Sequence, residues 1–311
     1  MRVTNNSFSQ GFLDQVNKLT TRQYRLQNQV ATGQKVQDVS DDPGAMGRIL
    51  VLKAESAATS QYQQNIDRQK EISTANFAVV KSLKKISDRA GEIAILSDGL
   101  KSPDELKIYA IEMGELIKQA VQVANTKNRG DYLLGGTKSD RQPFVATTGL
   151  DGAVDSVTYE GSDRLVENEI AEGVVISAQT LGESTDLNGP AGLLADSRTG
   201  ADFFKHLLSL HQNLLAGDTN AIATTDRVNL AKDEDNFLLH IGMNGALQAR
   251  LESTLADSRN TIGKVSEQIS SEMDADMAET LMKLNQTQVA YQAALQGGAR
   301  IMQTSLLDFL R

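Results

Sequence analysis

The last 35 residues of the chain, 277–311, restrict its fold most because they combine a heptad pattern with almost no charge. Apolar side chains recur there in steps of four and three, the spacing of the contact seam on a long paired helix. Between Leu284 and Leu307 the only charged residue is Arg300. A helix that is apolar nearly all round must be covered. We therefore expect this end of the chain to pack against other helices.

Both chain ends carry such a seam. The predicted tail seam contains Leu281, Leu284, Tyr291, Leu295, Met302 and Phe309, with Leu306 beside it in the final turns. The N-terminal segment repeats the pattern at Phe12, Val16, Leu19, Gln23, Leu26 and Val30, and Gly33 is the expected stop. The apolar residues named in the two segments, without Gln23 and Gly33, are the candidate subunit-assembly residues. An ordinary core helix is the alternative for the tail, but such a helix keeps a charged outer face.

Composition excludes several classes of protein. The formal net charge of −9 argues against general nucleic-acid binding. The chain has no cysteine, so disulfide scaffolds, thiolate metal sites and cysteine nucleophiles are excluded. The tail contains five glutamines and no long apolar run, so we expect no membrane span. The first ten residues contain no apolar core of a signal peptide, so we expect no cleaved secretory signal.

Between the two ends, the sequence has two regions of helical periodicity with one region of short extended runs between them. Ser40-Asp41-Asp42-Pro43 predicts a helix start, and a helical pattern continues to about Ser97. Ser102-Pro103-Asp104-Glu105 predicts a capping box and a helix over 103–127. Glycine-punctuated extended runs follow at 156–160, 164–170 and 173–177. A short helix follows Gly200, and a long helix is expected over 218–272.

We therefore predict a mainly α fold with a β insert (α+β). It is a rod built from a long-helix bundle, with heptad terminal segments and a small β-rich domain in the middle. The expected parts are an N-terminal assembly segment (1–40), the first half of the rod (41–130), the β-rich insert (131–202), the returning half of the rod (203–272) and a C-terminal assembly segment (273–311).

Three stretches in order resemble the flagellin family, in particular its hook–filament junction members. Thr32-Gly-Gln-Lys-Val-Gln-Asp-Val-Ser-Asp-Asp-Pro43 is similar to the family's T-G-[K/R]-x-[V/I]-x-x-[P/A]-S-D-D-P signature. The run from Arg129 to Thr137, followed by Pro143-Phe144, resembles its G-x-Y-[L/I]-F-x-G-x-x-T…P-F stretch. The segment from Tyr291 to Leu310 resembles the family's ending. Filament flagellin usually has D-D-A-A-G where this chain has Asp41-Asp42-Pro43-Gly44-Ala45.

The resemblance implies a secreted structural subunit of the bacterial flagellum that joins a hook-side junction protein to flagellin. Its implied partners are copies of itself and neighbouring junction subunits, the hook-side junction protein, flagellin and an export chaperone. It also implies export through the flagellar type III apparatus without a cleaved signal. The terminal segments are then expected to be mobile in the monomer and to pair into a coiled coil on assembly. Filament flagellin itself stays open, as does a cytosolic coiled-coil scaffold or signalling module.

No enzyme constellation was found in the sequence. His206 and His211 are five residues apart, off one helical face, and no HExxH pattern is present. Glu272, Asp274 and Asp276 imitate the first ligands of a calcium loop, but its sixth position is a methionine where glycine is needed. We expect these acids to be solvated at a helix start. We therefore predict no catalytic residue, cofactor or metal site.

Overall fold

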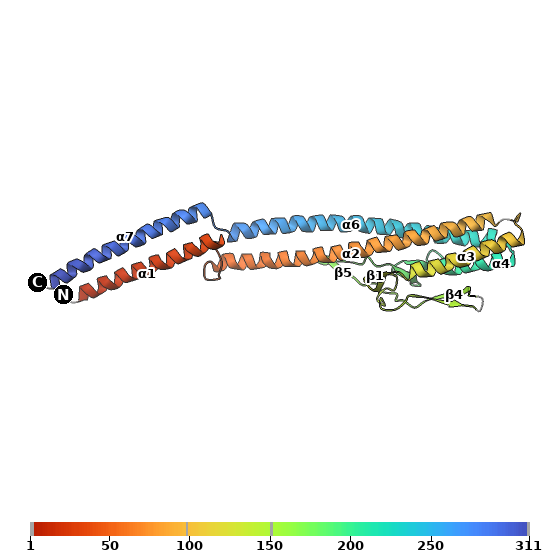
Figure 1. Cartoon of the computed structure of the whole chain (residues 1–311), viewed down its shortest axis with the longest axis horizontal. Helices are drawn as coiled ribbons and strands as arrows, with labels where there is room; N and C mark the ends of the chain where they lie inside the picture. The colour runs from red at the N-terminus through yellow and green to blue at the C-terminus, as the bar shows by residue number, and fades with distance from the viewer. Residues whose placement is uncertain (1–2, 98, 150–151, 310–311) are drawn as a thin grey trace. The chain divides into compact units, whose positions relative to one another are not determined.

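The computed structural model describes residues 3–97, 99–149 and 152–309, and side-chain surroundings for residues 10–97, 99–149 and 152–300. The chain forms two compact units, one made of residues 1–58 and 261–311 and the other of residues 59–260. Helices α2 (Pro43–Leu96) and α6 (Arg227–Met273) contribute residues to both units. The mainly α fold with a β-rich middle region is confirmed (Figure 1).

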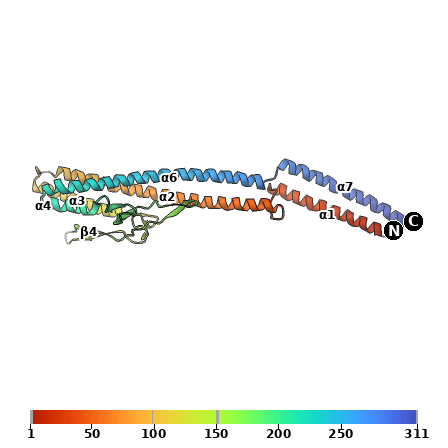
Figure 2. The ribbon, with the colours of Figure 1, turned by 180° about the vertical axis from the view of Figure 1, so that it is seen from behind.

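The terminal unit consists of two helix pairs. Helices α1 (Val3–Thr32) and α7 (Met277–Phe309) lie side by side and antiparallel (Figures 1 and 2). The start of α2 and the end of α6 form the second pair. Buried Val36, Ala45 and Ile49, with partly buried Met46 and Met273, make a small apolar cluster where the helices break.

The larger unit is a helical bundle with strands along one side (Figure 2). In it, α2 and α6 pack with α3 (Pro103–Ala124) and α4 (Phe203–Ala216). The predicted capping box is confirmed, since Ser102 and Glu105 bond reciprocally and Pro103 begins α3. One apolar stripe of α3 is buried in the bundle, namely Leu106, Ala110, Met113, Ile117, Ala120 and Ala124.

Two helix bounds differ from the prediction. The helix expected over 103–127 ends at Ala124, because the Asn125 side chain bonds back to Val121 O and across to Phe144 O. The helix expected to begin at 218 starts with the short turn α5 (Thr219–Ala221) and the π-helix η1 (Ile222–Asp226) before α6. Buried Asp226 ends this π-helix and accepts hydrogen bonds from Ser209 (2.7 Å) and Asn213 (2.6 Å) of α4.

The described residues of the β-rich region form four small sheets. Strands β1 (Lys127–Asn128) and β2 (Asp131–Tyr132), β3 (Phe144–Thr148) and β4 (Val154–Tyr159), and β5 (Asn168–Ala171) and β6 (Val174–Ile176) form antiparallel pairs. Strand β8 (Gly192–Asp196) pairs in parallel with β7 (Leu181–Ser184) and antiparallel with β9 (Ala201–Asp202). The run expected as a strand over 164–170 is extended only from residue 168.

Side-chain amides on the long helices bind the backbone of this region. Gln69 accepts from Ala178 N (2.7 Å), and Asn76 donates to Ala178 O (2.6 Å). Asn236 of α6 donates to the carbonyls of Gly192 and Leu193, both at 2.9 Å. Buried backbone groups need such partners. These amides therefore hold the β-rich region against α2 and α6.

Candidate assembly interface

The predicted N-terminal seam is the face of α1 that is turned away from solvent. Leu26 is buried, and Phe12, Val16, Leu19 and Val30 are partly buried. The face meets α7, because Gly298 of that helix lies directly against the Phe12 ring. The structure therefore brings these five residues together along one contact. Whether they also contact other subunits stays a prediction.

The side of α7 that is turned away from solvent differs in part from the predicted tail seam. Leu284 and Tyr291 are partly buried, whereas Leu281 and Leu295 are each 44% exposed. The role of all four residues in subunit assembly stays a prediction. Other positions of α7 that are turned away from solvent are Thr280, Thr287, Ala294 and Gly298. Together with Leu284 and Tyr291 they follow one another in steps of four and three. Met302, Leu306 and Phe309 also belong to the predicted seam, but they lie outside the residues whose side-chain surroundings are described.

Threonine takes these inward positions because its hydroxyl is satisfied within α7. Thr280 donates to Asp276 O and Thr287 to Lys283 O, each at 2.7 Å. A buried hydroxyl with a local backbone partner carries little desolvation cost, and its small size lets the helices approach. Hydrophobicity alone selects the leucines, so the sequence reasoning missed both threonines. The signal that could find them is the spacing of seven to Ala294 and the glycine at 298.

The exposed side of α7 is nearly uncharged and mixes large apolar side chains with amides. Leu281, Met282, Val289 and Leu295 are all exposed there. From Leu284 to Ala299 no residue is charged. Large exposed apolar surfaces mark sites of interaction with other molecules. Among the helices within residues 3–309, none is both long and apolar enough to cross a membrane.

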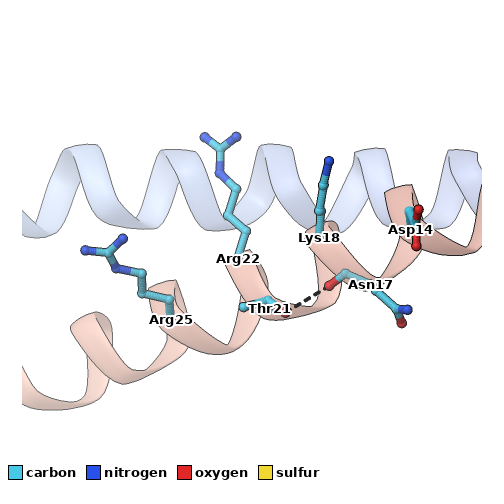
Figure 3. A pocket seen from close by; sticks show the side chains of 6 residues that line it. All are labelled: Asp14, Asn17, Lys18, Thr21, Arg22 and Arg25. Carbon is cyan, nitrogen blue, oxygen red and sulfur yellow. Dashed lines mark hydrogen bonds between the residues drawn. The ribbon is translucent and has the colours of Figure 1, made fainter. Parts of the chain in front are cut away.

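The flank of α1 next to this contact is basic. Lys18, Arg22 and Arg25 project from α1 at helical spacing, and Lys18 and Arg22 extend beside α7 (Figure 3). With Asp14, Asn17 and Thr21 they line a shallow groove of about 490 Å³. Arg25 pairs with Asp41 at 3.3 Å. The two helices thus present different outer faces, a basic one on α1 and a nearly uncharged one on α7.

The loop after α1 contacts the segment between α6 and α7. We call residues 33–42 and 271–276, together with Arg48, the clip. Gln34 and Asp274 form an antiparallel bridge, and Ala275 N donates to Gly33 O at 2.8 Å. Arg48 donates two hydrogen bonds to the Glu272 carboxylate, at 2.9 and 3.1 Å. This pairing lowers the pKa of Glu272 and raises that of Arg48.

The acids that imitate a calcium loop have structural roles in the clip. Glu272 pairs with Arg48, and Asp274 accepts from the Ser270 hydroxyl. Asp276 caps α7 by accepting from Ala278 N (2.9 Å) and Glu279 N (3.1 Å). Within the described residues, no group of three or more acidic or histidine side chains is placed to hold a metal ion.

The histidines lie in the bundle and make structural bonds. The Nδ1 atom of His206 lies 2.8 Å from the buried carboxylate of Asp233, and burial raises the pKa of that acid. His240 donates through Nε2 to Gly192 O at 3.1 Å, and burial lowers its pKa. Arg129-Gly130 is the two-residue turn between β1 and β2, with both φ angles positive.

Comparisons with known proteins agree with the resemblance found at both ends. Residues 242–310 match the family described as "Bacterial flagellin C-terminal helical region". The chain is 30% identical over 140 residues to flagellar hook-associated protein 3 of Salmonella typhimurium; the match spans 44% of each protein. It is 22% identical to a flagellin of Listeria innocua over 298 residues, which cover 95% of this chain and 93% of the flagellin.

The fold also has a solved counterpart. A structure of a flagellar hook-associated protein from Vibrio parahaemolyticus superimposes with a TM-score of 0.64 at 18% sequence identity. The superposition covers 75% of this chain and all of that one. At this identity it shows the shared fold alone. The resemblance to the flagellin family and to hook-associated protein 3 is confirmed.

Proposed function

We infer that this chain, a relative of the flagellin family and of hook-associated protein 3, is a structural subunit of the bacterial flagellum at the hook–filament junction. The observation that carries this proposal is the α1–α7 pair, in which the exposed side of α7 is nearly uncharged and leaves four large apolar side chains open to solvent. Such a face is unfavourable in water and favours a subunit that is completed by its neighbours. The similarity of the tail to the flagellin C-terminal region supports the same function.

In the proposed mechanism, the terminal helix pairs of several subunits pack together. Leu281, Met282, Val289 and Leu295 leave water when neighbours cover α7. Because these side chains are only about half exposed, covering all four supplies on the order of 3–6 kcal/mol per subunit. Part of this offsets the entropy lost on association. The contacting chains are copies of this protein, the hook-side junction protein and flagellin. Catalysis has no part in this mechanism.

To reach the hook–filament junction, the chain must be exported from the cell. We propose that the chain leaves the cell through the flagellar type III apparatus without a cleaved signal, with an export chaperone covering exposed apolar helix surface beforehand. The absence of cysteine suits a chain that crosses between redox compartments. A chain without cysteine cannot form wrong disulfides outside the cell.

Filament flagellin is the second candidate function, because the similarity to a flagellin extends over nearly the whole chain. The two candidates differ in where the protein is located and how much of it is present. A junction subunit occupies one narrow zone of each flagellum, whereas flagellin forms its length. A cytosolic scaffold would be absent from the flagellum altogether.

The test is to locate the protein on isolated flagella. We expect antibody labelling at one zone next to the hook, and the intact chain as a minor component of sheared flagella by mass spectrometry. Deleting its gene should leave hooks without filaments and release flagellin into the medium. Labelling along the filament would favour the flagellin alternative. Retention in the cytosol would contradict both flagellar functions.

A further inference from the structure

The chain contains two Asn-Gly pairs, and the fold places them in opposite surroundings. Asn188-Gly189 lies in the loop between β7 and β8, whereas Asn244-Gly245 lies inside α6. Asparagine is one of the thermolabile residues of proteins. Glycine after it makes it more reactive, because the backbone nitrogen of glycine approaches the asparagine side chain without hindrance from a side chain of its own. The surroundings of each pair therefore decide whether it can react.

Asn188 lies in an exposed loop with its side chain unbound. Residues 185–188 are all exposed to solvent. The backbone nitrogen of Asn188 donates to Asp186 Oδ1 at 2.9 Å. Within the described part of the chain, neither the Asn188 carboxamide nor the backbone nitrogen of Gly189 makes a hydrogen bond. The two groups that would react therefore break no existing bond, and water reaches the loop.

The backbone on both sides of the Asn188 side chain is held in place. Before it lies the hydrogen bond to Asp186, and after it Arg198 donates to Gly189 O at 3.0 Å. The Arg198 guanidinium also binds the buried Asp196 carboxylate, at 2.6 and 3.0 Å. The loop is thus bound at two points, and the free carboxamide lies between them.

Asn244 has the opposite surroundings, although the residue that follows it is the same. It is buried, and its amide nitrogen donates to Ser73 O at 3.0 Å. Its Oδ1 atom accepts from the Ser73 hydroxyl (3.1 Å) and from Gln248 Nε2 (3.0 Å). Gly245 lies inside α6, where each backbone nitrogen donates to the carbonyl four residues earlier. A reaction here would have to break all of these bonds.

We propose that Asn188 is a site of spontaneous deamidation in the folded protein and that Asn244 is protected. The backbone nitrogen of Gly189 loses its proton to hydroxide and bonds to Cγ of Asn188. The bond from Cγ to the side-chain nitrogen breaks, and ammonia leaves a five-membered succinimide. Water then adds to either ring carbonyl, and the ring opens to aspartate or isoaspartate.

The product differs from the parent in charge and in backbone length. Either form adds one negative charge two residues from Asp186. Isoaspartate also places one extra carbon in the main chain between the hydrogen bonds to Asp186 and Arg198. The reaction needs water alone, and it takes place whether or not the protein has the flagellar function proposed above.

The test follows both pairs in one sample. Full-length folded protein is incubated in mildly alkaline buffer made with heavy-oxygen water, then digested with trypsin in ordinary water and analysed by tandem mass spectrometry. Peptide 165–198 carries Asn188, and peptide 233–250 carries Asn244. We expect heavy oxygen at residue 188 with loss of its amide, and an unchanged amide at residue 244. Deamidation during digestion adds no label.

Two controls isolate the effect of the fold. In denaturant both pairs should react at similar rates, because only the folded protein distinguishes them. Asn188→Gln should acquire no label at residue 188, since its longer side chain would have to close a less favourable six-membered ring. Circular dichroism shows that the incubated samples are folded. Equal labelling of the two peptides in the folded protein, or an Asn188 amide that is retained there, overturns the proposal.

Discussion

Gly298 of α7 lies directly against the ring of Phe12 of α1. A Cβ added at Gly298 would come within 2.7 Å of two ring carbons and closer still to a third. At the neighbouring Gly297, an added Cβ would meet nothing within 4 Å. One glycine of this pair is thus required by the contact between the terminal helices, and the other is not.

We therefore predict opposite results for the same substitution at the two glycines. Gly298→Leu should push Phe12 out of the seam and reduce recovery of the protein in sheared flagella. Gly297→Leu should assemble normally and favour the helix by somewhat less than about 1 kcal/mol, as expected for replacing a helical glycine. Equal recovery of the two variants would show that the contact is absent from the assembled state.

The exposed face of α7 is tested by Leu295→Asp. A charge buried without a partner is strongly unfavourable, so assembly should fail and flagellin should appear in the medium. The melting temperature of the monomer should not change, since Leu295 lies outside the core. Leu187→Asp, also at an exposed leucine, is the control and should assemble. Normal filament growth with Leu295→Asp would rule out α7 as the assembly element.

In the isolated monomer, the amides of α7 around residues 284–300 should exchange quickly with deuterium. The contact with α1 buries mainly small or partly exposed side chains, and little apolar burial gives low local stability. The amides of α3, whose stripe is buried in the bundle, should exchange slowly and serve as the internal reference. Protection of α7 equal to that of α3 would mean that the terminal pair is already stable alone.

Core packing of the bundle is tested at Leu83, which is fully buried. Leu83→Ala should lower the free energy of unfolding by about 2–5 kcal/mol, because it removes buried methyl groups and leaves a cavity. Leu100→Ala, at a leucine that is 91% exposed, should have little effect. Chemical denaturation of both variants provides the comparison, and similar midpoints would contradict the assignment of Leu83 to the core.

Stability should fall in mild acid because of His240. Its pKa is lowered from the ordinary 6.5, chiefly by burial, against smaller opposing effects of its bond to Gly192 and of nearby Asp196. The unfolded chain therefore binds a proton at this site before the folded one, so stability decreases as pH falls below about 6.5. His240→Gln keeps a donor for Gly192 O but cannot titrate. Buried Asp233 has a raised pKa and acts in the opposite sense at lower pH.

The measurement compares unfolding free energies of the two proteins at pH 8 and pH 5.5. At pH 8 the imidazole is neutral in both folded and unfolded states, so any difference there is the packing effect of the substitution. The variant should lose less stability than the parent on going to pH 5.5. An identical loss in both proteins would exclude His240 as the origin.

Much of the local structure could be predicted from the sequence. The capping box at Ser102, the buried stripe from Leu106 to Ala124 and the inward face of α1 all follow from short-range rules. Helical periodicity, capping and turn chemistry depend on residues within a few positions of one another. For that reason the order of the helices and the place of the β-rich region between them could be deduced without any knowledge of long-range contacts. Of its strands, only β4, β5 and β6 coincide with predicted runs.

Tertiary structure alone decided which side of α7 faces α1 and how the β-rich region attaches. Leu281 and Thr280 are adjacent in sequence but point about 100° apart on a helix, and both stripes keep heptad spacing. The partner selects Thr280 and Thr287 because their hydroxyls are satisfied locally and the small side chains allow close approach. Likewise, Asn76 meets Ala178 and Asn236 meets Gly192 across long stretches of chain. Periodicity cannot encode such contacts, since they depend on which backbone groups folding leaves without partners.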